Sequence, residues 1–414
     1  MAKKPKPTTK NETPARQSPL PLLAAPLFLL LLLGVLYLGN RLGFIEVDWQ
    51  SLFSHEFVTE VTSALLTPTA VSTPPPAIPP SPSTAPAITP VPGRRWNYQL
   101  YFTTPTYPDV ETSRSETIMQ GLIAVINQAR RSLDVAVYEL DLDPVGDALL
   151  AARNRGVAVR LVTDSDSLAE DETLIRLKKE NLPIVPDKRE PIMHNKFVVV
   201  DGQAVWTGSW NFTANDTYRN NNHALYLQSQ ELAQNYTAEF EEMFTHKAFG
   251  PTSTSRTPYP RLQIGQTLVE ACFAPEDKCA DQLIVLIRQA QQSIRFMAFS
   301  FTHPGIGKAV IDRAKTGVLV QGIFETRGSE TDTSELARMK RQKLDVWQDG
   351  NPYTLHHKVF ILDEKTVVLG SFNFTENAAQ SNDENMLVVH NPELAQQFLA
   401  EFNRVYEQAK NPPQ

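Results

Sequence analysis

Apolar residues recur along the chain in patterns that predict two kinds of element. Short runs rich in β-branched residues, such as 135–138 and 157–162, have the length and composition of buried strands. Between them, apolar residues lie three or four positions apart, which is the spacing of one helix face. Near the C-terminus these positions are Leu394, Phe398, Phe402 and Val405. Strands that alternate with helices predict an α/β fold in which helices cover the sheets.

A different pattern is the almost wholly apolar run over residues 20–38, which carries no charge. As a helix it would extend about 28 Å, roughly the thickness of a bilayer core. We therefore predict a transmembrane anchor over residues 20–39. A cleavable signal peptide is the alternative, but the run is long for one, and Gly39-Asn40-Arg41 does not match a small-x-small cleavage site.

The residues on either side of this apolar run form three further segments that differ in composition. Residues 1–19 form a basic tail that predicts a cytoplasmic N-terminus, with everything after the anchor outside the cytoplasm. Residues 40–67 are interpreted as a juxtamembrane segment. Residues 68–95 form a proline-rich linker, which could span about 80 Å as a semi-rigid spacer between membrane and domain.

Net charge and cysteine content limit the classes of function that the chain could have. The 414 residues carry a net charge of −7, but residues 1–41 have six Lys/Arg against one acid, a net of +5, so residues 42–414 carry −12. An acidic body argues against the broad phosphate-binding surface of nonspecific DNA-binding proteins. Cys272 and Cys279 are expected to form a disulfide in an oxidising compartment, with two free buried thiols as the alternative.

The remaining sequence contains an internal repeat. Residues 126–141 match residues 287–302 at an offset of 161, and the offset becomes 162 from His194 onward. The repeat predicts two tandem domains of the same α/β fold, over residues 96–250 and 260–410.

Each copy contains the pattern His-x-Lys-x-x-x-x-Asp. The residues are His194, Lys196 and Asp201 in the first copy and His356, Lys358 and Asp363 in the second. Chance would give about 0.02 such matches in a chain of this length. Duplication alone would also repeat structural residues, but the neighbouring apolar positions differ between the copies and these three do not. The pattern therefore indicates function.

The spacing of the motif places its histidine and lysine together. An apolar run after each motif predicts a strand, on which side chains two positions apart share a face. His357 is expected to point the other way. Each strand is followed by a Gly-Ser-x-Asn-Phe-Thr turn, whose side chains could bind phosphoryl oxygens; an ordinary turn is the alternative. The candidate phosphate-binding residues are Ser209, Asn211, Ser371 and Asn373.

Two imidazoles with two ammonium groups suit the cleavage of a phosphodiester. A neutral histidine can act as nucleophile while a protonated one acts as acid, near neutral pH. The lysines can stabilise charge on the nonbridging oxygens. A bell-shaped pH profile that reports the pair is expected.

These motifs resemble those of the phospholipase D superfamily, over residues 101–406. The turn and residues 382–389 are most similar to the small bacterial nuclease-type branch. The resemblance implies two pseudo-symmetric α/β/α domains that share one active site, so that a monomer suffices, although the sequence leaves the oligomeric state open. It also implies a phosphohistidine intermediate, no metal and no other cofactor.

The copies differ 28 residues after the motif histidine, where the second has Glu384 and the first has Asn222. By the resemblance, a carboxylate here hydrogen-bonds the catalytic histidine of the opposite half. Glu384 would then orient His194 as the nucleophile and leave His356 as the acid. The motif aspartates, which end their strands, are interpreted as supporting residues that fix the following turns.

The leading hypothesis is a membrane-anchored, metal-independent phosphodiesterase that hydrolyses phospholipid head groups. The anchor and the acidic body favour phospholipid, whereas the nuclease-like turns favour the alternative, an extracytoplasmic endonuclease acting on DNA or RNA. Phosphatidyl transfer is a variant of the same chemistry. A non-catalytic binding protein is disfavoured because both His/Lys pairs are intact.

Overall fold

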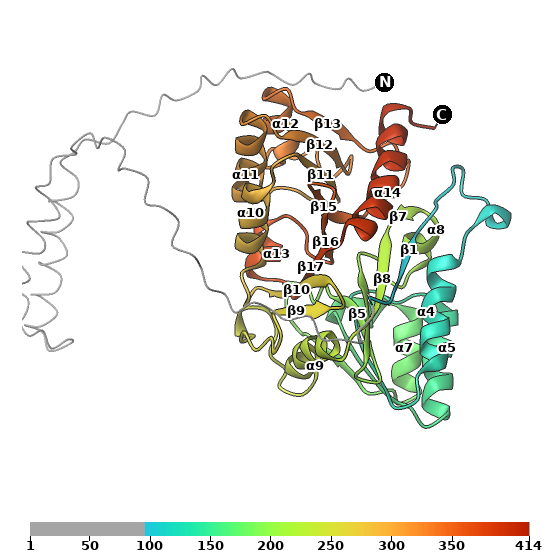
Figure 1. Ribbon diagram of the computed structural model, residues 1–414. Coiled ribbons are helices and arrows are strands. Elements are labelled where there is room, and N and C mark those ends of the chain that lie inside the picture. Colours follow the sequence, from blue (N-terminus) through green and yellow to red (C-terminus); the bar gives the residue numbers. More distant parts are fainter. Residues whose placement is uncertain (1–95, 414) are drawn as a thin grey trace, which may run out of the picture. The chain divides into compact units, whose positions relative to one another are not determined.

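Two mixed β-sheets, one from each half of the repeat, organise the computed structural model, which describes residues 96–413 (Figure 1). They confirm the predicted α/β class. The predicted tail, anchor and juxtamembrane segment, and the linker up to residue 95, lie outside the described residues. Within 96–413 no helix is long and apolar enough to cross a bilayer.

The first sheet has seven strands in the order β1-β8-β6-β5-β2-β3-β4. Strands β2, β3 and β4 run parallel to one another, and the other neighbours are antiparallel. The strand bounds are β1 (Tyr98–Phe102), β2 (Ser132–Val137), β3 (Ala158–Thr163), β4 (Ile184–Pro186), β5 (Lys196–Val200), β6 (Ala204–Gly208) and β8 (His223–Gln228).

The second sheet repeats this order and adds one edge strand, giving β13-β12-β11-β15-β16-β17-β10-β9. Its parallel part is β11, β12 and β13. The bounds are β9 (Arg261–Ile264), β10 (Thr267–Ala274), β11 (Ser293–Ala298), β12 (Leu319–Phe324), β13 (Asp345–Gln348), β15 (Lys358–Leu362), β16 (Thr366–Gly370) and β17 (Glu384–His390). The duplicated sequence thus folds as a duplicated sheet.

Helices pack on both faces of each sheet (Figure 1). In the first half they are α4 (Thr117–Gln128), α5 (Asp143–Asn154), α6 (Ser165–Glu170), α7 (Glu172–Lys179), α8 (Ala214–Tyr218) and α9 (Gln230–Phe244), with short 3-10 turns at Glu111–Ser113 and Gly250–Thr252. In the second half they are α10 (Cys279–Gln289), α11 (Pro304–Lys315), α12 (Glu335–Arg341), α13 (Glu376–Gln380) and α14 (Pro392–Lys410). Helices α9 and α14 contact the sheets on the side opposite α5 and α11, respectively.

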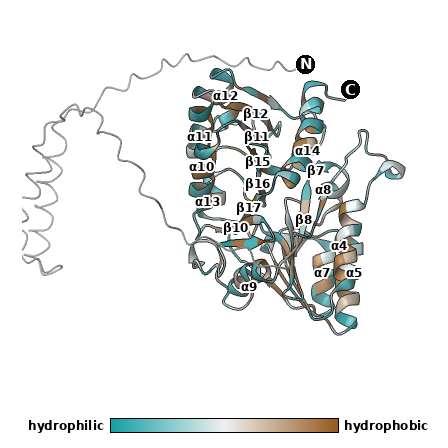
Figure 2. Cartoon of the chain, in the orientation of Figure 1, coloured by the Kyte–Doolittle hydropathy of each residue, from teal (hydrophilic) through white to brown (hydrophobic). Residues whose placement is uncertain are grey.

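Three hydrophobic clusters form the core. One joins the two halves and contains the inward faces of α9 and α14, and the other two lie under the remaining helices of each half. The predicted apolar face of α14, Leu394 to Val405, is buried in the joint cluster. Most helices carry both hydrophilic (teal) and hydrophobic (brown) residues in Figure 2, as expected when one helix face is buried and the other meets water.

The two halves also share backbone pairing next to the motif histidines. Strand β7 (Asn220–Asn221) pairs in parallel with β14 (Thr354–Leu355), and Met193 forms the equivalent bridge with Asp383. The His194 N–H donates to the Asp383 carbonyl at 2.9 Å, and the His356 N–H donates to the Asn221 carbonyl at 3.0 Å. Each motif histidine is therefore positioned by the opposite half.

The motif aspartates hold a different segment from the one predicted. Asp201 accepts hydrogen bonds from the backbone N–H groups of residues 130, 131 and 132, and Asp363 does the same for residues 291, 292 and 293. These groups belong to the loops that enter β2 and β11. The prediction that they fix the following turn was wrong, because the neighbouring strand of the sheet brings the entering loop closer to the carboxylate.

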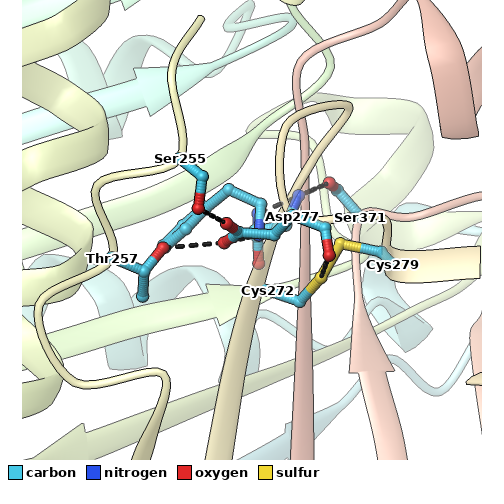
Figure 3. Close-up of a disulfide and its surroundings, with 8 residues drawn as sticks. Ser255, Thr257, Cys272, Asp277, Cys279 and Ser371 are labelled. Carbon is cyan, nitrogen blue, oxygen red and sulfur yellow. Dashed lines mark hydrogen bonds between the residues drawn. A yellow bond between two sulfur atoms is a disulfide. The ribbon is translucent and has the colours of Figure 1, made fainter. Parts of the chain in front are cut away.

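Cys272 in β10 and Cys279 at the start of α10 form a disulfide (Figure 3). The loop between them is also held by Asp277, which accepts hydrogen bonds from the Thr257 hydroxyl at 2.7 Å, the Ser255 hydroxyl and the Phe273 N–H. The start of the second half is thus cross-linked both covalently and by hydrogen bonds.

Candidate active site

One cavity of about 530 Å³ lies between the two halves, and both motif histidines line it. Asn211 and Asn373 from the two turns line it as well. The structure therefore brings together residues that are 162 positions apart in the repeat.

The motif lysines lie beside these histidines and are 1% exposed. They start β5 and β15, and the Lys196 ammonium donates to the His194 carbonyl at 2.6 Å, while Lys358 donates to the His356 carbonyl at 2.8 Å. Each ammonium also lies over an aromatic ring, at 5.1 Å from the centre of Tyr138 and 4.5 Å from that of Phe299, respectively. The lysines do not line the cavity themselves, but each lies directly behind residues that do. Burial lowers the pKa of Lys358 well below its usual value, and Lys196 lowers it further.

His194 is oriented by Glu384 of the other half. The Nδ1 atom lies 2.8 Å from the Glu384 Oε2, and the carboxyl group is fully buried. This is the contact that the resemblance implied. Burial raises the pKa of Glu384, and the nearby ammonium groups of Lys196 and Lys358 oppose that rise. Because Nδ1 is taken by this contact, Nε2 is the ring nitrogen left for a ligand.

His356 has a different partner, which the sequence did not reveal. Its Nδ1 lies 2.9 Å from the Asn222 Oδ1 and 3.4 Å from an Asp216 carboxylate oxygen. Asp216 is 3% exposed and accepts a hydrogen bond from the Asn211 N–H. A carboxylate therefore approaches each motif histidine from the opposite half. In the second copy the position of Asp216 is Ala378, so a comparison of the copies gave no signal.

Burial and nearby charge set the protonation of these groups. Burial lowers the pKa of His194 well below the usual value, and Lys196 and Lys358 lower it further. Burial and the same two lysines lower the pKa of His356 in the same way. Burial lowers the pKa of Lys196 to about 8, although Glu384 opposes the shift. Both imidazoles are therefore neutral in the free protein at neutral pH.

The turn serines do not line the cavity. The Ser209 hydroxyl donates to the Asn222 Oδ1 at 2.8 Å, and the Ser371 hydroxyl accepts the Asn385 N–H at 3.0 Å. Both serines are fully buried. The predicted role of Ser209 and Ser371 in binding phosphate does not fit this geometry, because their hydroxyls are used to hold the segments that carry Asn222 and Glu384.

The residue between the histidine and the lysine of each motif, Asn195 or His357, points away from the cavity, as the strand alternation predicts. His357 lies 3.0 Å from His223 through the two Nδ1 atoms, and its Nε2 lies 3.1 Å from the Glu401 carboxylate. At the equivalent place in the other half, the Asn385 amide donates to the Asn195 Oδ1 at 2.8 Å. These contacts tie the halves together behind the site.

The wall of the cavity is acidic on the side of the first half. Its carboxylates are Glu139, Asp141, Asp171 and Asp216. The residues at the repeat positions of Glu139 and Asp141 in the second half are Ser300 and Thr302, which are neutral. Burial raises the pKa of Glu139 to about 7, although Lys196 opposes the shift. The cavity therefore has a positive centre and a negative wall on one side.

A duplicated α/β fold that converges two His/Lys pairs on one cavity defines a phosphodiesterase. The family described as "Cardiolipin synthase, PLD-like domain" matches residues 122–244 and 283–406, one match in each half. The chain belongs to the phospholipase D superfamily.

Several relatives match about a third of this chain. The phospholipase D of Rickettsia bellii (strain RML369-C) is 34% identical over 151 residues, which cover 35% of this chain and 75% of that protein. The mitochondrial cardiolipin hydrolase of Homo sapiens is 30% identical over 138 residues, which cover 33% of this chain and 55% of that protein.

Two solved structures are also similar to this chain. NUC from Salmonella typhimurium, a phospholipase D family member, is 36% identical and covers 34% of this chain and 95% of its own, with a TM-score of 0.33. The phosphatidylserine synthase of Haemophilus influenzae Rd KW20 is 14% identical and covers 74% of this chain and 87% of its own, with a TM-score of 0.55. The second likeness extends over both halves and concerns the fold.

Proposed function

We propose that this phosphodiesterase is anchored in a membrane by residues 20–39 and hydrolyses phospholipid head groups outside the cytoplasm. The observation that carries the proposal is the pair of buried histidines whose Nδ1 atoms are both occupied, at 2.8 Å and 2.9 Å, in one cavity beside two lysines. Their Nε2 atoms remain for the phosphorus and for the leaving oxygen.

His194 acts as the nucleophile. With its Nδ1 proton donated to Glu384, the neutral ring has a lone pair on Nε2. Attack on phosphorus forms a P–N bond and breaks the bond from phosphorus to the head-group oxygen. Lys196 and Lys358 stabilise the negative charge of the nonbridging oxygens.

His356 acts as the acid and then as the base. The bound diester anion and the Asp216 carboxylate favour its protonated form, which gives a proton to the leaving head-group alcohol. The neutral ring then takes a proton from water, whose oxygen attacks phosphorus and breaks the P–N bond. The products are the free alcohol and a phosphatidic acid.

The acidic wall supports a phospholipid with a cationic head group. Carboxylates at the cavity attract an ammonium group and repel the neighbouring phosphates of a nucleic acid strand. The alternative, an endonuclease, is supported by the nuclease-like Gly-Ser-x-Asn-Phe-Thr turns. The two substrates differ in the charge that lies next to the scissile phosphate, which makes them separable by experiment.

The test offers the full chain, in EDTA, vesicles of phosphatidylcholine or phosphatidylglycerol and, in parallel, single- and double-stranded DNA and RNA. We expect head-group release that is lost in His194→Ala and His356→Ala and kept in His246→Ala, a control at an exposed histidine. Acid-labile phosphate trapped on His194 would support the assigned role, and phosphate on His356 would refute it. Cleavage of nucleic acid alone would replace phospholipid as the substrate.

A further inference from the structure

Three glutamates meet at the junction of the two halves. Glu239 and Glu242 lie three residues apart on α9 and so share a helix face, while Glu276 lies in the loop that joins β10 to α10. One carboxylate oxygen of each residue lies within 4.8 Å of the others. Oxygens bound to the same Ca²⁺ at about 2.4 Å are at most about 4.8 Å apart, so these three could bind one ion.

The cluster contains a buried carboxyl group, Glu239, whose hydrogen-bond partner in the described residues is another carboxyl group of the same cluster. Glu239 is 4% exposed, and the side-chain hydrogen-bond partner that its carboxyl group has in residues 96–413 is the carboxyl group of Glu276. The Glu276 Oε2 is also buried and has no hydrogen-bond partner in that range. A void of about 10 Å³ lies among the three side chains, which is about the volume that one small bound species needs. Burying carboxylates in this way is costly unless a proton or a cation joins them.

The charges that face the cluster are mainly negative. Burial and the charge of Glu276 raise the pKa of Glu239 well above its usual value, and the carboxylates of Asp383 and Glu242 add to the shift. Burial raises the pKa of Glu276 to about 7. Arg256 lies at the rim, but it is exposed and forms no ion pair with the three glutamates in the described part of the chain.

The surrounding backbone holds the carboxylates in place. Glu242 uses Oε1 to accept hydrogen bonds from the Thr254 N–H at 2.8 Å and its hydroxyl at 2.9 Å, so its other oxygen remains available. Glu276 immediately precedes Asp277, which anchors the disulfide-closed loop (Figure 3). Because these side chains are already held in place, they lose little conformational entropy when a cation binds.

We propose that Glu239, Glu242 and Glu276 bind a divalent cation of the calcium type, which links α9 of the first half to the start of the second. The ligand set contains only oxygen, which suits Ca²⁺ rather than zinc. Water would complete the coordination. The cation is structural and takes no part in the proposed phosphoryl chemistry, so this inference is independent of the substrate.

The test measures thermal unfolding of the full chain in EDTA, in CaCl₂ and in MgCl₂, with calorimetric titration of CaCl₂. At pH about 8, calcium at about 100 times its Kd should raise the Tm by about 4 °C and bind once per chain. At pH about 5.5 the increase should shrink, because protons compete for the carboxylates. Mg²⁺ should raise the Tm less, since it demands octahedral geometry.

Matched variants separate cation binding from a purely structural role. In EDTA, Glu276→Gln should be at least as stable as the native chain, because it removes a repelling charge, and it should lose the response to calcium. Glu239→Gln should behave in the same way. Glu330→Gln, at an exposed acid of the second half, should keep the response. An unchanged Tm in CaCl₂, or a response that persists in Glu276→Gln, would overturn the proposal and leave protons as the species that hold the three carboxylates together.

Discussion

Replacing Asp363 by asparagine should weaken the fold without removing the activity. Its Oδ1 accepts the N–H groups of Gln291, Gln292 and Ser293 at 3.0, 2.7 and 3.0 Å. Asparagine keeps an acceptor oxygen at this position and tolerates the left-handed backbone, where φ is 52°. The substitution therefore removes the charge and keeps the side-chain shape, and an NH₂ group replaces the Oδ2 that accepts the Gln291 N–H at 2.8 Å.

The size of the effect follows from these three bonds. A hydrogen bond to a charged acceptor is worth about 1 kcal/mol more than one to a neutral acceptor. Asp363 is half-buried, so water can hydrogen-bond the groups whose contacts are weakened and offset part of the lost stability. We therefore expect the free energy of unfolding to fall by about 2 kcal/mol. In a folded unit of this size, that loss lowers the Tm by about 3 °C.

The pH dependence gives a second check on the same variant. Burial works in the opposite direction, but the three N–H groups lower the pKa of Asp363 below its usual value. The stabilisation should therefore be complete at neutral pH and disappear as the pH falls below about 4.

Urea unfolding and head-group release, normalised to folded protein, are the assays for Asp363→Asn. The first copy provides a replicate, because Asp201→Asn weakens the three equivalent contacts and should cost the same. Loss of activity at an unchanged Tm would refute the structural role and make the motif aspartate part of the chemistry.

Other predictions concern the site and the disulfide. Glu384→Gln should lower kcat about 100-fold, measured by burst kinetics, because His194 loses the carboxylate that makes it basic. The rate should fall above about pH 8 in a pH profile of kcat/KM, as Lys196 loses its proton. Asp216→Asn should move this loss of activity to lower pH, because the charge of Asp216 raises the pKa of Lys196. If the loss of activity stays at the same pH, Asp216 has no electrostatic role. Replacing both cysteines, whose separation is 7 residues, should reduce the free energy of unfolding by about 2.5 kcal/mol in urea titrations and leave the folded enzyme active.

The spacing of apolar residues and the internal repeat predicted most of the fold. The alternation of side chains along the chain that enters β15 correctly separated His356, which lines the cavity, from His357, because an extended chain has only two faces. The resemblance also correctly paired Glu384 with His194 across the halves. Both inferences concern residues that recur in the two copies or in the family.

The contact of Asp216 was not predicted, and the phosphate-binding role predicted for Ser209 and Ser371 was wrong, for the same physical reason. Asp216 reaches His356 only because β7 and β14 pair across the halves, and that pairing is two residues long on each side. The Ser209 hydroxyl could face either a phosphate or Asn222, and the sequence does not indicate which polar group lies nearer. Tertiary contacts of this kind depend on how two sheets dock, which local patterns do not encode.

The backbone pairing beside each motif histidine has a consequence for biogenesis. Since Met193 pairs with Asp383 and Leu355 with Asn221, the segment that positions each motif histidine is completed by residues synthesised much later or earlier in the chain. Contacts so distant in sequence form late in folding. We therefore expect a nascent first half to be inactive, and phosphodiesterase activity to appear only when the last strands of the second half have docked.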